Sequence, residues 1–147
     1  MDDFTKAFFN NVKKDSGQEG MQFPPPVMEY LDPTLLNHTP EKSIKWSFPI
    51  KASYNNPFGS TFGGYYSMFF DAAFGPFSGI TCQKPTTSLD LNVTFLKPLF
   101  PKDKEVIIEV EVISKSKTYI ILSGKAYKGE EKILVATCTS RLLILNR

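Results

Sequence analysis

Residues 55–75 read NNPFGSTFGGYYSMFFDAAFG, and this stretch constrains the fold more than any other part of the chain. A glycine-rich loop runs into a helical segment on which large apolar side chains cover nearly every side. A helix that is apolar all round has to be enclosed by other structure rather than lie on a surface. The sequence therefore predicts a central helix with the rest of the chain folded around it.

One acidic residue, Asp71, lies in the middle of this apolar helix, and we expect it to be enclosed with the helix. A carboxylate in such surroundings is costly unless it is hydrogen-bonded or paired. Asp71 is therefore either a structural group that binds the neighbouring loop or a reactive group. The residues alone leave both interpretations open.

Composition excludes several classes of function. The chain has 147 residues, with 17 Lys and Arg against 15 Asp and Glu, and its lysines are too scattered to form a nucleic-acid surface. No apolar run reaches the ~18 residues of a membrane span, and the acidic start does not resemble a secretory signal, so we expect a cytoplasmic protein.

The cysteine and histidine content bears on metal binding. Cys82 and Cys138 do not stand in a metal-ligand spacing, and we interpret them as buried thiols. The only histidine is His38, so a zinc site built on two histidines of one chain is excluded. We expect no metal.

Residues 1–42 are predicted to form an N-terminal helical extension. Apolar residues between Phe4 and Val12 recur at helical spacing, and the three prolines after Phe23 begin a second short helix that ends near Leu31. His38 follows in a proline-bounded loop and is expected to be exposed. The extension either covers an edge of the following domain or forms a lid over a pocket.

Residues 43–147 are predicted to form one domain in which five antiparallel strands wrap around the central helix, an α+β architecture. Alternating or β-rich patterns mark the strands at residues 43–51, 87–95, 105–113, 118–127 and 132–145. The helix follows the first strand and is expected to end at Gly75-Pro76, and the last four strands are expected to form a meander. Pro49 indicates a sheet edge or a bulge, since proline cannot donate to a ladder.

Three motifs in this order carry a family resemblance. They are N-x-x-G-x-x-x-G-G at residues 56–64, the helix with its internal acid, and the strand T-S-L-D-L-N-V-T-F-L-K-P at residues 87–98. Together they resemble the hot-dog-fold acyl-CoA thioesterases of the phenylacetate-degradation (PaaI-like) type, over roughly residues 43–145. The resemblance implies a hot-dog fold and hydrolysis of a small-molecule acyl thioester, with coenzyme A as part of the substrate and no other cofactor.

The resemblance also implies catalytic roles for four residues. The Asn56 amide and the Gly63 backbone N–H correspond to the groups that polarise the thioester carbonyl. Asp71 corresponds to the carboxylate that activates water or attacks directly, and Ser88 to the hydroxyl that positions the water. Independently of the family, the unpaired N–H groups at a helix start favour an oxyanion near Gly63.

Substrate contacts are implied at Phe62, Gly64 and Thr87. The family usually has His-Gly-Gly where this chain has Phe62-Gly63-Gly64, so the polar contact of that imidazole is missing. Plainer interpretations remain, because the glycines would equally permit a tight turn and Asn56 is a common turn residue. A non-catalytic acyl-binding protein and a purely structural oligomerising domain are therefore alternative functions.

The spacing of two candidate residues predicts an assembly. Asp71 follows Gly63 by eight residues, which at ~1.5 Å of rise per residue separates them by about 12 Å along the helix. Attack on a carbonyl needs reacting atoms within roughly 3 to 3.5 Å, so Asp71 of one copy is expected to face Gly63 and Asn56 of another. The sequence thus predicts a homodimer, and the family is similar, often pairing dimers into tetramers.

Overall fold

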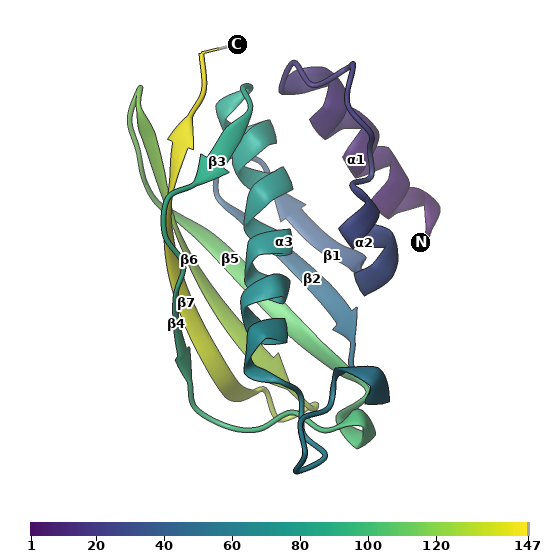
Figure 1. Ribbon diagram of the computed structural model, residues 1–147. Coiled ribbons are helices and arrows are strands. Elements are labelled where there is room, and N and C mark those ends of the chain that lie inside the picture. The colour runs from purple at the N-terminus through teal and green to yellow at the C-terminus, as the bar shows by residue number, and fades with distance from the viewer. Residues whose placement is uncertain (147) are drawn as a thin grey trace.

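The computed structural model describes residues 1–146, and its centre is the apolar helix α3 (Gly63–Cys82). An antiparallel sheet curls past one side of α3, and two N-terminal helices cover another side (Figure 1). Four phenylalanines of α3 are at most 1% exposed, namely Phe69, Phe70, Phe74 and Phe77. The predicted α+β class, with a sheet around a central helix, is confirmed.

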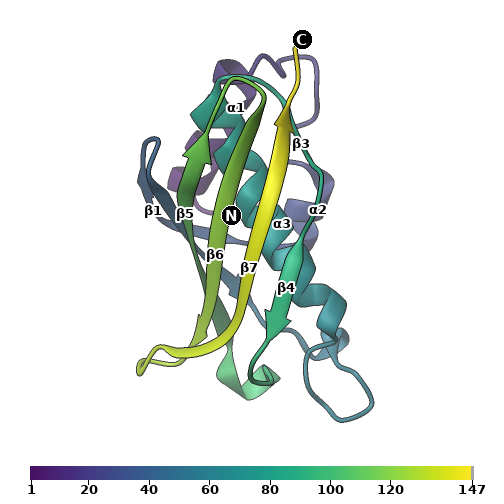
Figure 2. The ribbon, with the colours of Figure 1, turned by 90° about the vertical axis from the view of Figure 1, so that its left-hand side faces the viewer.

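Within residues 1–146 the sheet has seven strands, two more than expected. Along one path the order is β1 (Thr34–Thr39), β2 (Ser43–Pro49), β5 (Glu105–Lys115), β6 (Tyr119–Lys128), β7 (Ile133–Ile144) and β3 (Thr86–Ser88). The remaining strand, β4 (Asn92–Phe95), also pairs with β7. Figure 2 shows β5, β6 and β7 side by side in front of α3.

The four-strand meander was a wrong prediction. Of the strands in the predicted meander, β5, β6 and β7 are neighbours in chain order, whereas residues 86–95 pair with β7 and not with β5. The reason is that β5 is already bonded to β2 on one side and to β6 on the other, so it has no free edge. The outer edge of β7 therefore takes both short strands.

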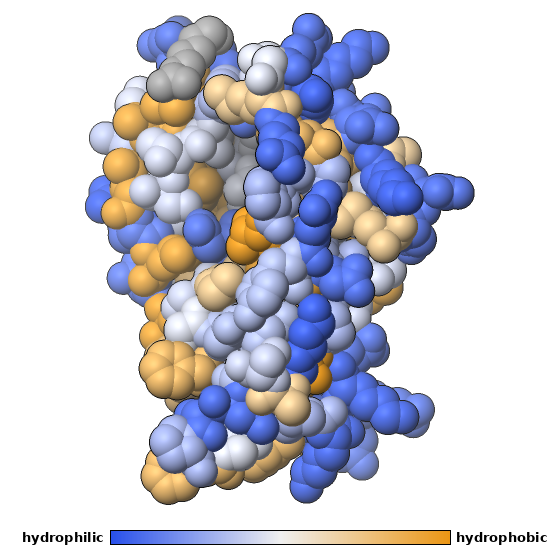
Figure 3. Space-filling view, turned by 45° about the vertical axis from the view of Figure 1, so that its right-hand side comes forward, coloured by the Kyte–Doolittle hydropathy of each residue, from blue (hydrophilic) through white to orange (hydrophobic). Residues whose placement is uncertain are grey.

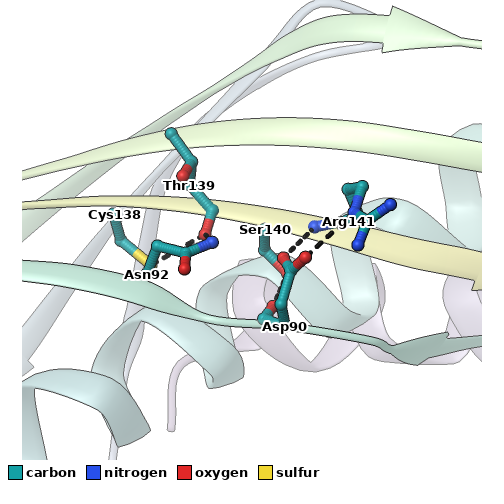
Figure 4. Close-up of polar contacts among 6 residues, drawn as sticks. All are labelled: Asp90, Asn92, Cys138, Thr139, Ser140 and Arg141. Carbon is teal, nitrogen blue, oxygen red and sulfur yellow. Dashed lines mark hydrogen bonds and ion pairs between the residues drawn. The ribbon is translucent and has the colours of Figure 1, made fainter.

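The expected strand at residues 87–95 is interrupted at Asp90. The Asp90 carboxylate accepts hydrogen bonds from the Arg141 backbone N–H at 2.8 Å and from Arg141 Nε at 2.9 Å (Figure 4). Ser140 Oγ donates to the Asp90 carbonyl at 2.7 Å. These bonds to β7 replace regular ladder pairing at Asp90, so the predicted strand is divided into β3 and β4.

Helix α3 continues past Gly75-Pro76, where the sequence had predicted its end. Proline inside a helix removes one backbone bond and costs ~3 kcal/mol or more. Here the following turns are anchored because Phe77, Ser78 and Gly79 are buried, and Ser78 Oγ donates to the Gly75 carbonyl at 2.7 Å. Burial of the last two turns thus overrides the proline signal.

The two predicted N-terminal helices are present as α1 (Asp3–Asp15) and α2 (Pro26–Leu31). Asp2 caps α1 by accepting a hydrogen bond from the Thr5 N–H at 2.8 Å. Phe8, Phe9 and Val12 are the buried apolar residues of α1, which packs against α3 and β1. None of the helices within residues 1–146 is both long and apolar enough to cross a membrane.

The exposed loop expected around His38 is instead the half-buried strand β1. His38 pairs with Ile44 of β2, and its ring contacts those of Phe8 and Phe77 edge-on, with centroids 5.2 and 5.9 Å apart. An irregularity between Leu35 and Asn37 obscures the period-two pattern in the sequence. On the β1 side of β2, strand pairing extends only as far as Ser47. Pro49 lies beyond this point, where β2 pairs with β5 alone, and this is the edge position predicted for the proline.

Candidate active site

Asp71 lies on a side of α3 that the chain itself leaves open. Its side chain is exposed, and Gly64 on the same helix is exposed as well, so the expectation that Asp71 is enclosed was wrong. The prediction failed because an all-apolar helix indicates only that every side is covered. It does not indicate whether the covering element belongs to the same chain. Asp71 Oδ1 accepts a hydrogen bond from Ser88 Oγ at 2.9 Å.

Strand β3 positions Ser88 against the helix. The hydroxyls of Thr86 on β3 and Ser78 on α3 also share a hydrogen bond, which fixes this strand to the helix two residues earlier. Alternate residues of a strand face the same side, so Thr86 and Ser88 face α3 and Thr87 points the other way. The structure therefore brings Ser88 to Asp71 but does not bring Thr87 there.

The second pair of predicted residues, Asn56 and Gly63, lines a separate cavity of about 350 Å³. Gly63 is the first residue of α3, and amides of a first helical turn have no intrahelical acceptor. The cavity wall is held by Tyr66, whose hydroxyl donates to the Lys97 carbonyl at 3.0 Å. The other lining residues are Ser60, Thr61, Phe95, Leu96 and Pro98.

Asn56 shapes the loop that leads into α3. Its Oδ1 accepts from the backbone N–H groups of Phe58 at 2.9 Å and Ser60 at 3.2 Å, which is the turn role that the plain interpretation assigned to it. Its Nδ2 donates to Ser60 Oγ at 3.0 Å. An amide nitrogen has two hydrogens, so one donor remains for a ligand in this cavity.

Neither the backbone conformation nor the packing of this chain requires glycine at position 63 or 64. Both have negative φ, and an added Cβ would lie 3.5 Å from the Phe95 ring at Gly63 and 3.7 Å from the Phe62 ring at Gly64, which are ordinary contact distances. A tight turn or close packing within the chain therefore does not explain them. Glycine at these positions leaves the backbone at the start of α3 accessible from outside the chain.

Phe62 stands immediately before α3, and the residue is 58% exposed. Its side chain makes no cap bond to the helix. The ring where the family usually has a histidine is therefore not part of the hydrophobic core.

A second cavity, of about 180 Å³, opens beside Asp71 between α2 and α3. Its lining residues are Pro25, Val27, Met28, Met68, Asp71, Ala72 and Pro76. The cavity at Asn56 and Gly63 shares none of them. One chain therefore joins Asp71 with Ser88, and Asn56 with Gly63, but does not join the two pairs. Sequence reasoning left open whether residues 1–42 cover an edge or a pocket, and it did not single out residues 25–28, because no local signal links them to Asp71.

The nearby thiol of Cys138 is poorly suited to act as a nucleophile. Burial, with a smaller effect of the negative charges of Asp71 and Asp90, raises the pKa of Cys138 to about 12. The thiol is therefore protonated at neutral pH, and the prediction of a buried thiol is confirmed for Cys138. Cys82 is half-buried, and burial raises its pKa as well.

Solved structures of similar shape define the class of fold. The PaaI protein of the phenylacetic acid degradation operon of E. coli aligns with a TM-score of 0.76 over 95% of this chain and 96% of its own, at 12% identity. AziG from S. sahachiroi gives 0.77 over 84% and 98% at 15% identity. The thioesterase HI1161 from Haemophilus influenzae gives 0.75 over 84% and 85% at 17% identity. This chain has the hot-dog fold.

Family membership follows from the sequence itself. The profile of the thioesterase superfamily matches residues 58–135, so this chain belongs to that superfamily. The matched region contains Gly63, Asp71 and Ser88, whereas Asn56 lies just before it. No curated protein sequence matches this chain.

Proposed function

We propose that this chain hydrolyses acyl-CoA thioesters to a carboxylic acid and free coenzyme A, at sites that two copies complete together. One observation carries the proposal. Asp71, to which Ser88 bonds, and Gly63, which lines the cavity with Asn56, belong to the same helix but lie about 12 Å apart along it. A two-fold dimer would bring Asp71 of one copy opposite Gly63 of the other.

The surface around these residues supports a dimer. Exposed large hydrophobic side chains lie before α3 and along β3 and β4, including Phe62 (58%), Leu89 (47%), Phe95 (55%) and Leu96 (49%). Figure 3 shows hydrophobic residues gathered at the left margin and lower left, while the right side is mostly hydrophilic. Within residues 1–146, β3 and β4 pair on one side only, with β7. Unpaired edges and apolar patches are typical of interfaces, and here we assign them to a second copy, with pairing of dimers as a further level of assembly.

The proposed reaction uses two donors and one base. The thioester oxygen accepts hydrogen bonds from the Gly63 N–H and Asn56 Nδ2, and one such donor is worth roughly 10²- to 10³-fold in rate. Asp71 of the other copy takes a proton from a water molecule, whose oxygen attacks the carbonyl carbon. The carbon–sulfur bond then breaks, and the thiolate leaves with that proton. Ser88 holds the carboxylate of Asp71 in place.

A second route to the same products has Asp71 attack the carbonyl carbon itself. A transient anhydride forms, the thiolate leaves, and water hydrolyses the anhydride. A single turnover in H₂¹⁸O tests the second route. ¹⁸O in the Asp71 carboxylate, found by mass spectrometry of the protein, would demonstrate an anhydride that water opens at the aspartyl carbon, because direct attack of water on the thioester labels only the product acid.

The test of hydrolysis is release of coenzyme A from a panel of acyl-CoAs, followed with a thiol-reactive dye. We expect release by the natural sequence, loss of release in Asp71→Ala, and no change in the control Glu19→Ala, which removes an exposed acid far from the site in sequence. If neither release nor binding of any acyl-CoA is observed, the chain is a structural domain and the proposal fails.

Phe62 favours one alternative, a non-catalytic protein that binds acyl-CoA. An exposed aromatic ring replaces the family's histidine at the start of α3, and it would add apolar contact to a ligand without supplying a polar group. This alternative predicts that acyl-CoA raises the melting temperature without any release of thiol. Release that depends on Asp71 would exclude it.

A further inference from the structure

The cavity between α2 and α3 has the character of a hydrocarbon site. Six of its seven lining residues are apolar or proline, and the seventh is Asp71. Three of them, Pro25, Val27 and Met28, come from the N-terminal extension, and the rest come from α3. An apolar chain gains free energy by leaving water for such a surface. The only lining residue that carries charge is the one to which we assign the chemistry.

The wall formed by α2 is held in a fixed position. Met28 and Leu31 are buried in the core, at 1% and 0% exposure. The Tyr30 and Tyr65 hydroxyls share a hydrogen bond of 2.8 Å that joins α2 to α3. Lys51 Nζ donates to the Tyr30 carbonyl at 2.9 Å. A wall anchored in this way can limit how far a bound acyl chain extends.

The size of the cavity decides what it can hold. Its volume of about 180 Å³ is below the ~300–1,000 Å³ of pockets that enclose a drug-sized ligand, so it is too small for coenzyme A. At roughly 30 Å³ for each water-sized group, it has room for about six such groups. A carbonyl next to Asp71 with about six carbons beyond it would fill this space.

We propose that this cavity is the acyl-chain subsite, that it takes a medium-length acyl group of about six carbons beyond the carbonyl, and that α2 sets this length. The inference rests on the proposed function, because it places the reacting carbonyl at Asp71. It also gives the N-terminal extension a part in substrate selection.

The experiment compares kcat/KM for acyl-CoAs from two to sixteen carbons. Each methylene that enters the cavity is worth about fourfold, equivalent to about 0.8 kcal/mol, so kcat/KM should rise with length and level off at about seven to eight carbons. Val27→Trp fills the cavity from the α2 side. We expect it to lower the octanoyl-to-acetyl ratio of kcat/KM at least tenfold.

The matched control is Glu29→Trp, which places the same ring on an exposed position of α2 that does not line the cavity. Its octanoyl-to-acetyl ratio should stay within twofold of the natural sequence. Met68→Ala enlarges the cavity from the α3 side and should move the preferred length upward by two or more carbons. If circular dichroism shows that Val27→Trp does not fold, Met68→Ala provides the test of the subsite instead.

Equal ratios in Val27→Trp, Glu29→Trp and the natural sequence would overturn the subsite, and so would a preferred length beyond twelve carbons. Absence of thiol release from every acyl-CoA would instead overturn the proposed hydrolysis. In that case calorimetry decides on the subsite separately. Octanoyl-CoA should bind at least tenfold more tightly than coenzyme A, and Val27→Trp should remove that advantage. Equal binding of the two ligands would overturn the subsite.

Discussion

Ser88 at the end of β3 donates a hydrogen bond of 2.9 Å to Asp71 in the middle of α3. The bond orients a carboxylate that is otherwise open to solvent. A hydrogen bond to a charged group is worth ~1.5–3 kcal/mol, so Ser88→Ala should lower kcat about tenfold to a hundredfold. Steady-state kinetics would measure this, with the exposed Ser53→Ala as a control. Unchanged kcat in Ser88→Ala would mean that the bond has no part in the reaction.

Mixing two inactive variants tests whether the site is shared between copies. Asp71→Asn and Asn56→Ala should each lose most activity, whereas a one-to-one mixture that exchanges subunits should recover about a quarter of it. Half of the dimers are then mixed, and each mixed dimer has one intact site out of two. If both residues acted within one chain, the mixture would recover nothing. Sedimentation should show a dimer or larger species in each sample.

Replacement of Phe62 by histidine should retain or raise the rate of thiol release. Phe62 is 58% exposed, so loss of its ring removes little core packing, and the imidazole supplies the polar contact that the family usually has. Phe62→Ala, which supplies no polar contact, is the matched comparison. A large fall in melting temperature in both variants would show that the ring is needed for the fold or the assembly instead.

Gly124 on β6 is required by the packing of α3 against the sheet. A Cβ there would lie 2.9 Å from ring atoms of Phe70 and Phe74. Overpacking of this kind costs typically ~1–3 kcal/mol, and Gly124→Ala should lower the free energy of unfolding by about that amount. Urea denaturation measures the change. Gly20→Ala, where an added Cβ meets nothing within 4 Å, should leave stability nearly unchanged.

The stability of the protein should depend on the protonation of His38. Burial lowers the pKa of His38 below its ordinary value of about 6.5, so the folded chain disfavours the charged ring. Below pH 6.5 the unfolded chain therefore binds a proton that the folded chain does not, and stability falls as the pH drops from about 6.5 toward the folded pKa.

The slope from His38 is at most about 1.4 kcal/mol per pH unit, the value for one proton. Urea denaturation between pH 5 and 8 should show this dependence, and His38→Phe should reduce it while keeping the aromatic contacts. Equal slopes in the two proteins would assign the acid sensitivity to other groups.

Local patterns predicted the central helix and most of the sheet because they depend on residues close in sequence. The apolar run from Tyr65 to Phe74 predicted a helix at the centre, and alternation predicted β2, β5 and β6. The same patterns failed at Asp90 and His38. At both positions the deciding contacts come from distant residues, such as Arg141 for Asp90 and Phe77 for His38.

Sequence patterns were enough to place an apolar helix with one acid at the core of an antiparallel sheet, and to show that Asp71 and Gly63 are too far apart to act on one carbonyl within a chain. The folded chain was needed to show that Asp71 is exposed, that Ser88 bonds to it, and that α2 forms a wall beside it. Spacing along a helix follows from backbone geometry, which any stretch of sequence carries with it. Packing between distant segments depends on the whole chain, and the open side of α3 becomes visible only when every covering element has been placed.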